Sequence, residues 1–92
     1  MSLPLTKGDR ERTTLLLRCA AEVAVTEDCV WPGRHAASRL GFSQRTCKRA
    51  CSLATKAVRY VARAAGRNPY WANDLDEYLA VVLEAANCVE DP

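Results

Sequence analysis

Acidic residues are missing from the middle of this 92-residue chain. Between Trp31 and Arg67 there is no Asp or Glu, and the flanking segments are acidic on balance, so the formal net charge of +2 conceals a strong internal polarity. A block of one sign repels itself, and such blocks are typical of proteins that meet a polyanion or an acidic partner. The basic residues in this segment are Arg34, Arg39, Arg45, Lys48, Arg49, Lys56, Arg59, Arg63 and Arg67.

Long apolar runs are also missing, so no segment is expected to span a bilayer, and we expect no membrane partner. The N-terminus has no apolar stretch of the kind found in signal peptides, so we expect a cytoplasmic protein. No strand-length segment alternates between apolar and polar residues. The composition, 49% hydrophobic and 26% charged, is that of a folded chain, and the length allows one domain with one modest core.

The five cysteines lack the paired spacings of small zinc sites. Cys47 and Cys51 lie four residues apart and combine on paper with Cys29 and His35, but the chain has no Cys-x-x-Cys or His-x-x-x-His pair. We therefore expect reduced cysteines that pack as small hydrophobes, and no metal or other cofactor. The single histidine has no nucleophile paired with it by sequence, so we expect no enzymatic activity.

The spacing of apolar residues predicts an all-α fold, a small bundle of four helices in one domain over residues 1–92. The expected helices span about 9–25, 34–40, 43–65 and 73–89, with a long third helix. Asp9 or Thr6 is expected to cap the first helix. Acidic residues in the first turn of the last helix suit the positive end of its dipole. The predicted inward stripes are Leu15, Leu16, Cys19, Ala20, Val23 and Ala24 in the first helix, and Leu75, Tyr78, Leu79, Val82, Ala86 and Val89 in the last.

Local signals place a tight turn between the second and third helices. Gly41 is free to adopt the left-handed conformation that ends a helix. Ser43 follows, and its hydroxyl can accept a hydrogen bond from the first backbone N–H groups of the next helix. Beyond Ser43 nothing interrupts the helical pattern until Gly66.

The third helix is predicted to carry its cations on one face. On a wheel of about 100° per residue, six further basic residues lie within roughly 60° of Arg45. No Glu is interleaved among them, although like charges one turn apart repel. These six residues are Lys48, Arg49, Lys56, Arg59, Arg63 and Arg67.

Residues 33–52 resemble the helix-turn-helix of bacterial and phage DNA-binding proteins. Ala37 matches the small residue of the first helix, and Gly41 matches the glycine of the turn four residues later. Leu40 and Phe42 provide the apolar positions around the turn, and Cys47 stands where the family usually has Val, Ile or Leu. The resemblance implies that the second helix of the motif enters the major groove of duplex DNA.

That resemblance implies base contacts from the start of the third helix and phosphate contacts farther along it. Gln can pair two ways with adenine and Arg two ways with guanine. The expected DNA-binding residues are Ser43, Gln44, Arg45, Thr46, Lys48, Arg49, Lys56, Arg59 and Arg63 in the third helix, with Arg34 and Arg39 in the second.

The favoured interpretation is a small DNA-binding regulator or accessory factor, with a homodimer formed through the acidic C-terminal helix as a further expectation. The alternative is a protein-interaction module, such as a phage-type adaptor or inhibitor, whose basic helix docks on an acidic host protein or on another copy. RNA ranks third, because no aromatic platform is interleaved with the cations.

Overall fold

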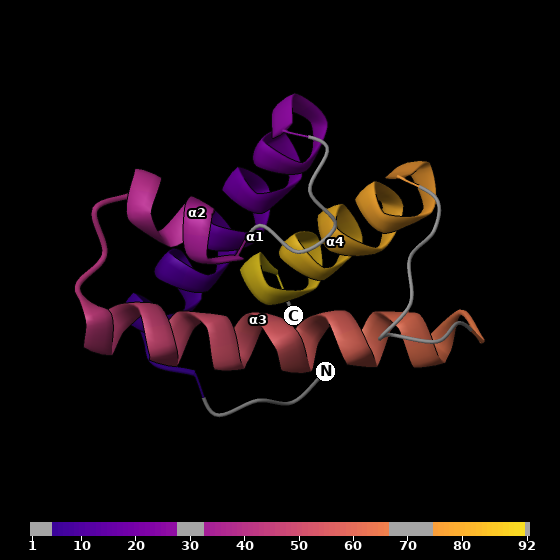
Figure 1. The fold of residues 1–92 in the computed structure, drawn as a ribbon. Coiled ribbons are helices and arrows are strands. Elements are labelled where there is room, and N and C mark those ends of the chain that lie inside the picture. The colour runs from indigo at the N-terminus through magenta and orange to yellow at the C-terminus, as the bar shows by residue number, and fades with distance from the viewer. Residues whose placement is uncertain (1–4, 28–32, 67–74, 92) are drawn as a thin grey trace.

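Four helices make up the computed structural model, which describes residues 5–27, 33–66 and 75–91 (Figure 1). They are α1 (Lys7–Glu27), α2 (Gly33–Arg39), α3 (Gln44–Ala64) and α4 (Leu75–Glu90). No strand occurs in these ranges, so the predicted all-α class is confirmed. In Figure 1, α3 runs along one side of the molecule, and α1, α2 and α4 lie together on the other side of the molecule, packed against α3.

The start of α1 is fixed by two reciprocal hydrogen bonds. The Thr6 hydroxyl accepts from the Asp9 backbone N–H at 3.0 Å, and Asp9 Oδ2 accepts from the Thr6 N–H at 3.4 Å. This is a capping box, with an aspartate in the place more often taken by Glu or Gln. Since Thr6 is the cap, α1 begins at Lys7, two residues before the predicted start at Asp9.

The turn between α2 and α3 forms as the sequence predicts. Gly41 has a φ of 73°, and its N–H donates to the Ser38 carbonyl at 3.1 Å. The Phe42 N–H reaches back to the Ala37 carbonyl at 3.0 Å, completing a Schellman C-cap. Ser43 then caps α3, with its Oγ accepting from the Thr46 N–H at 3.2 Å. The two helices are thus joined through backbone hydrogen bonds that leave the first turn of α3 at the surface.

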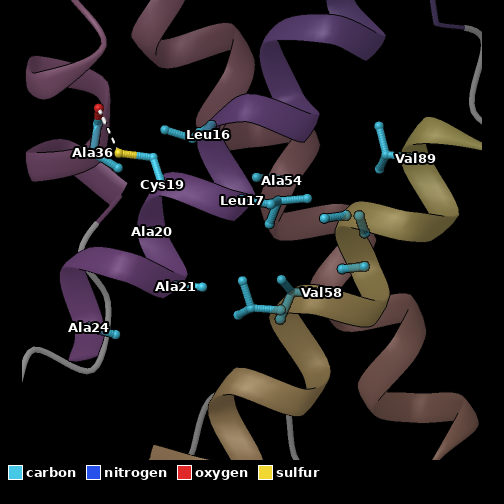
Figure 2. Packing of buried hydrophobic residues seen from close by; sticks show 14 of the residues in the cluster. Leu16, Leu17, Cys19, Ala20, Ala21, Ala24, Ala36, Ala54, Val58 and Val89 are labelled. Carbon is cyan, nitrogen blue, oxygen red and sulfur yellow. Dashed lines mark hydrogen bonds between the residues drawn. The ribbon is translucent and has the colours of Figure 1, made fainter.

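Small side chains dominate the core. Buried residues from all four helices form one cluster, and each helix contributes alanines to it (Figure 2). Where α1 meets α2, the buried Cys19 thiol lies 3.9 Å from the Ala36 carbonyl oxygen. The largest fully buried aliphatic side chains are Leu16, Leu17, Val23, Val82 and Val89.

The predicted inward stripes of the first and last helices are confirmed for most positions, with one correction in α1 and one in α4. Leu15 is 50% exposed, whereas its neighbour Leu17 is 1% exposed and fills the core. The apolar face of α1 is therefore rotated from the prediction toward Leu17 and Ala21, both of which are buried. Leu75, at the first residue of α4, is 37% exposed because the core begins one turn later at Tyr78. In the part of the chain that the structure describes, no helix is long and apolar enough to cross a membrane.

Candidate nucleic-acid interface

The outer side of α3 carries its cations, and its inner side carries apolar residues. Arg45, Lys48, Lys56 and Arg63 are exposed, and we call these four residues the basic face. The segregation predicted by the wheel is therefore confirmed for five of the six cations in residues 44–64, and the sixth, Arg59, is half-buried. The buried residues on the opposite side of the helix are Ala50, Leu53, Ala54, Ala57, Val58, Val61 and Ala62.

The four cations of the basic face are not neutralised within the described residues. None of them forms an ion pair among residues 5–27, 33–66 and 75–91. Arg45 and Arg63 are eighteen residues apart, which places them about 27 Å from one another along the helix axis. The arrangement is an extended line of positive charge in contact with solvent, which is suited to a polyanion.

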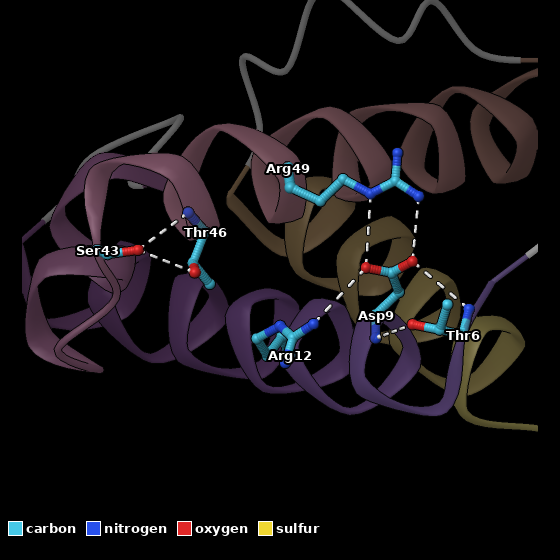
Figure 3. Close-up of polar contacts among 6 residues, drawn as sticks. All are labelled: Thr6, Asp9, Arg12, Ser43, Thr46 and Arg49. Atoms are coloured by element: carbon cyan, nitrogen blue, oxygen red, sulfur yellow. Dashed lines mark hydrogen bonds and ion pairs between the residues drawn. The ribbon is translucent and has the colours of Figure 1, made fainter.

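Arg49 differs from its neighbours because Asp9 of α1 binds it (Figure 3). Its Nη2 lies 3.0 Å from Asp9 Oδ2, and its Nε lies 3.4 Å from Asp9 Oδ1. The side chain of Asp9 is only 8% exposed, and Arg12 approaches the same carboxylate at 3.8 Å. Arg49, expected from the sequence to contact DNA, is held in this structure as a link between α1 and α3.

Ionisation of Asp9 is favoured by this arrangement. The hydrogen bond from Arg49 is the main cause that lowers the pKa of Asp9 below its ordinary value of 3.8, and the hydrogen bonds from Thr6 act in the same direction. Burial opposes these contributions. The pKa of Arg49 is raised for the same reason, by its hydrogen bond to Asp9.

Replacing Asp9 by Asn should therefore reduce stability at neutral pH more than in acid. Because the pKa of Asp9 is lowered on folding, its stabilising effect is complete above 3.8 and disappears as the pH falls through its folded-state value. Urea denaturation midpoints should show a gap between wild type and Asp9→Asn at pH 7 that narrows below pH 3.8. Glu84→Gln, on the exposed side of α4, is the control. A gap for Asp9→Asn that stays constant with pH would contradict the assignment.

At the start of α3, some polar side chains form the helix cap and others are exposed to solvent. The Ser43 hydroxyl donates to Thr46 Oγ1 at 2.9 Å and also accepts from the Thr46 N–H (Figure 3). Its hydrogen-bonding capacity is largely used within the cap. Gln44 and Arg45 are exposed beside it. Of the residues expected to read bases, these two, with Lys48, present the most accessible polar groups.

The second helix adds two cations beside this turn. Arg34 and Arg39 are both exposed on α2, at its two ends. Arg34 lies close enough to Cys51 of α3 to influence that thiol electrostatically. Arg59 of α3 is half-buried and thus less accessible than the basic face. Arg67 lies outside the described residues.

Tyr60 is an exposed aromatic residue beside the basic face, and it is not among the residues predicted from the sequence. It is 50% exposed, one turn after Lys56 and three residues before Arg63. One exposed ring therefore lies among the cations, although a single tyrosine is not the platform of several aromatic residues that RNA-binding surfaces use. The signal was available, because Tyr60 lies about 60° from Arg45 on the helical wheel, at the border of the stripe.

α4 carries four acidic residues and no Lys or Arg. Its exposed carboxylates belong to Asp76, Glu84 and Glu90, and Glu90 pairs with Arg18 of α1. Across the three described ranges, no group of three His, Cys, Asp or Glu residues is arranged to hold a metal ion.

No protein-family model matches the chain, and comparisons with characterised proteins and with solved structures give no match.

Proposed function

We propose that this protein binds duplex DNA, as a small regulator or accessory factor, with the start of α3 directed into the major groove. The observation that supports this is the basic face: four exposed cations on one helix, none with a carboxylate partner in the described parts of the chain. Duplex DNA is a regular polyanion, and neutralising its phosphates releases condensed counterions, which drives binding.

Geometry divides the roles along α3. The major groove is about 12 Å wide, so a straight helix that enters it by one end leaves it before 27 Å have passed. Gln44 and Arg45 are suited to base edges, since each can form a bidentate pair. Lys56 and Arg63 are suited to phosphates, and the exposed ring of Tyr60 between them offers a hydroxyl or a stacking face. Self-association through α4, where Leu83 is 45% exposed, would double these contacts.

The test is selection of bound sequences from a random duplex pool, followed by two matched substitutions. Arg45→Gln should weaken binding to the selected sequence about 5- to 150-fold more than binding to random duplex, the equivalent of ~1–3 kcal/mol. Arg63→Gln should weaken both equally, because a phosphate contact carries no sequence information.

Polyglutamate serves as the matched polyanion, since it presents carboxylates without grooves. The proposal requires duplex DNA to bind at concentrations where polyglutamate does not displace it. If no duplex changes the amide chemical shifts or the electrophoretic mobility at low salt, the proposal fails. Retention on an acidic protein surface in the same experiments would favour the alternative function, a protein-interaction module.

A further inference from the structure

Two thiols meet on α3, away from the basic face. Cys47 and Cys51 are one helical turn apart, and their sulfur atoms are separated by 3.9 Å. Both are free cysteines and half-buried, so they contact the core while part of each side chain faces solvent. They thus form a pair of soft donors that the rotamers of this structure bring together on one turn of α3.

The separation of the sulfur atoms suits ligation of one ion between them. A disulfide requires about 2.03–2.05 Å, so at 3.9 Å the pair is not bonded. With bonds as long as those of zinc–thiolate sites, about 2.3 Å, one ion between the two sulfur atoms would be bound at an S–metal–S angle of about 116°. That angle is common for three- or four-coordinate ions, and it requires no change in the backbone of α3.

The donor set decides which ion is suitable. Thiolates are soft ligands and select ions such as Cu(I). Structural zinc sites use four protein ligands, and no third His, Cys, Asp or Glu joins this pair in the described ranges. We propose that Cys47 and Cys51 together bind one soft monovalent cation of the Cu(I) class, with any remaining coordination supplied from solution.

Binding of Cu(I) here is an exchange of protons for a metal ion, without oxidation or reduction. Each S–H bond breaks, an S–Cu bond forms, and both protons pass to solvent. Two thiolate sulfurs are soft donors, and such donors favour Cu(I) over harder divalent ions.

The experiment is competition for Cu(I) between the full chain and a colorimetric Cu(I) chelator, under reducing and anaerobic conditions. The wild type should withdraw one equivalent of Cu(I), and X-ray absorption should show sulfur ligation by two protein thiolates. Cys47→Ser and Cys51→Ser should each lower the affinity by more than about 100-fold, since losing a group that merely supports a ligand already costs 10–100-fold.

Matched controls separate this site from the other thiols. Cys88→Ser, in a half-buried cysteine of α4, should retain the wild-type affinity. Circular dichroism checks that each variant is helical, and Cys47→Ala and Cys51→Ala repeat the test without adding a hydroxyl. A double Cys47/Cys51 variant that still withdraws Cu(I), an equal loss in Cys88→Ser, or no competition by the wild type would overturn the proposal. None of these readouts depends on DNA.

Discussion

Replacing Arg45, Lys48, Lys56 and Arg63 together by Gln is expected to weaken binding to random-sequence duplex by between three and four orders of magnitude at 0.1 M salt. Random-sequence duplex offers Arg45 and Lys48 no preferred base, so all four cations are counted here as phosphate contacts. Each neutralised phosphate contributes a slope of about 0.9 to the fall of log affinity with log salt, so four contacts contribute about 3.6 log units at that concentration. If the wild type contacts about six phosphates, its slope near −5 should decrease to about −2 in the variant. Fluorescence anisotropy over a salt series measures both quantities.

The matched control removes the same amount of charge from another surface. Lys7, Arg10, Arg12 and Arg18 lie on α1, and replacing them by Gln lowers the net charge equally. Arg18 pairs with the half-exposed Glu90, and such surface pairs add little stability. Arg12 lies 3.8 Å from the buried Asp9, which keeps its closer partner Arg49 in the variant. Gln, Lys and Arg have similar helix propensities, so both variants should fold. An equal loss of affinity in the two variants would mean that total charge governs binding, and the basic face would then have no special role.

The sequence predicted those parts of the fold that are set by neighbouring residues. The turn before α3 depends on Gly41 and Ser43. Gly41 adopts a positive φ, and Ser43 accepts a hydrogen bond from the backbone of a residue only three positions later. The exposure of the basic face likewise follows from helical periodicity over one uninterrupted helix. In these regions local chemistry and tertiary structure agree, so sequence reasoning is sufficient.

Contacts between distant residues could not be predicted in this way. Asp9 and Arg49 are forty positions apart, and no local rule connects the cap of α1 with the stripe of α3. This one contact ties Arg49, which the sequence predicts as a DNA contact, to the start of α1. The contact between the Cys47 and Cys51 thiols could not be predicted for a different reason. Their spacing of four residues is visible in the sequence, but the distance between their sulfur atoms depends on side-chain rotamers.

The rotation of α1 also depends on its packing against three other helices, and it leads to the largest stability effect we expect. Leu17→Ala should lower the free energy of unfolding by about 2–5 kcal/mol, because it removes a fully buried side chain and leaves a cavity. Small domains typically have about 5–15 kcal/mol of stability, so this single change removes a large part of it. Urea denaturation monitored by circular dichroism gives the value directly.

Leu15→Ala is the control, two positions away on the same helix. Leu15 is 50% exposed, so its replacement should change the free energy of unfolding by only about 0.5 kcal/mol or less. Both substitutions exchange Leu for Ala within α1, so helix propensity and side-chain chemistry cancel, and the difference reports burial alone. A larger loss for Leu15→Ala than for Leu17→Ala would show that α1 is rotated the other way. Asp9, eight residues before Leu17, would then turn with the helix, and its contact with Arg49 would have to be assigned anew.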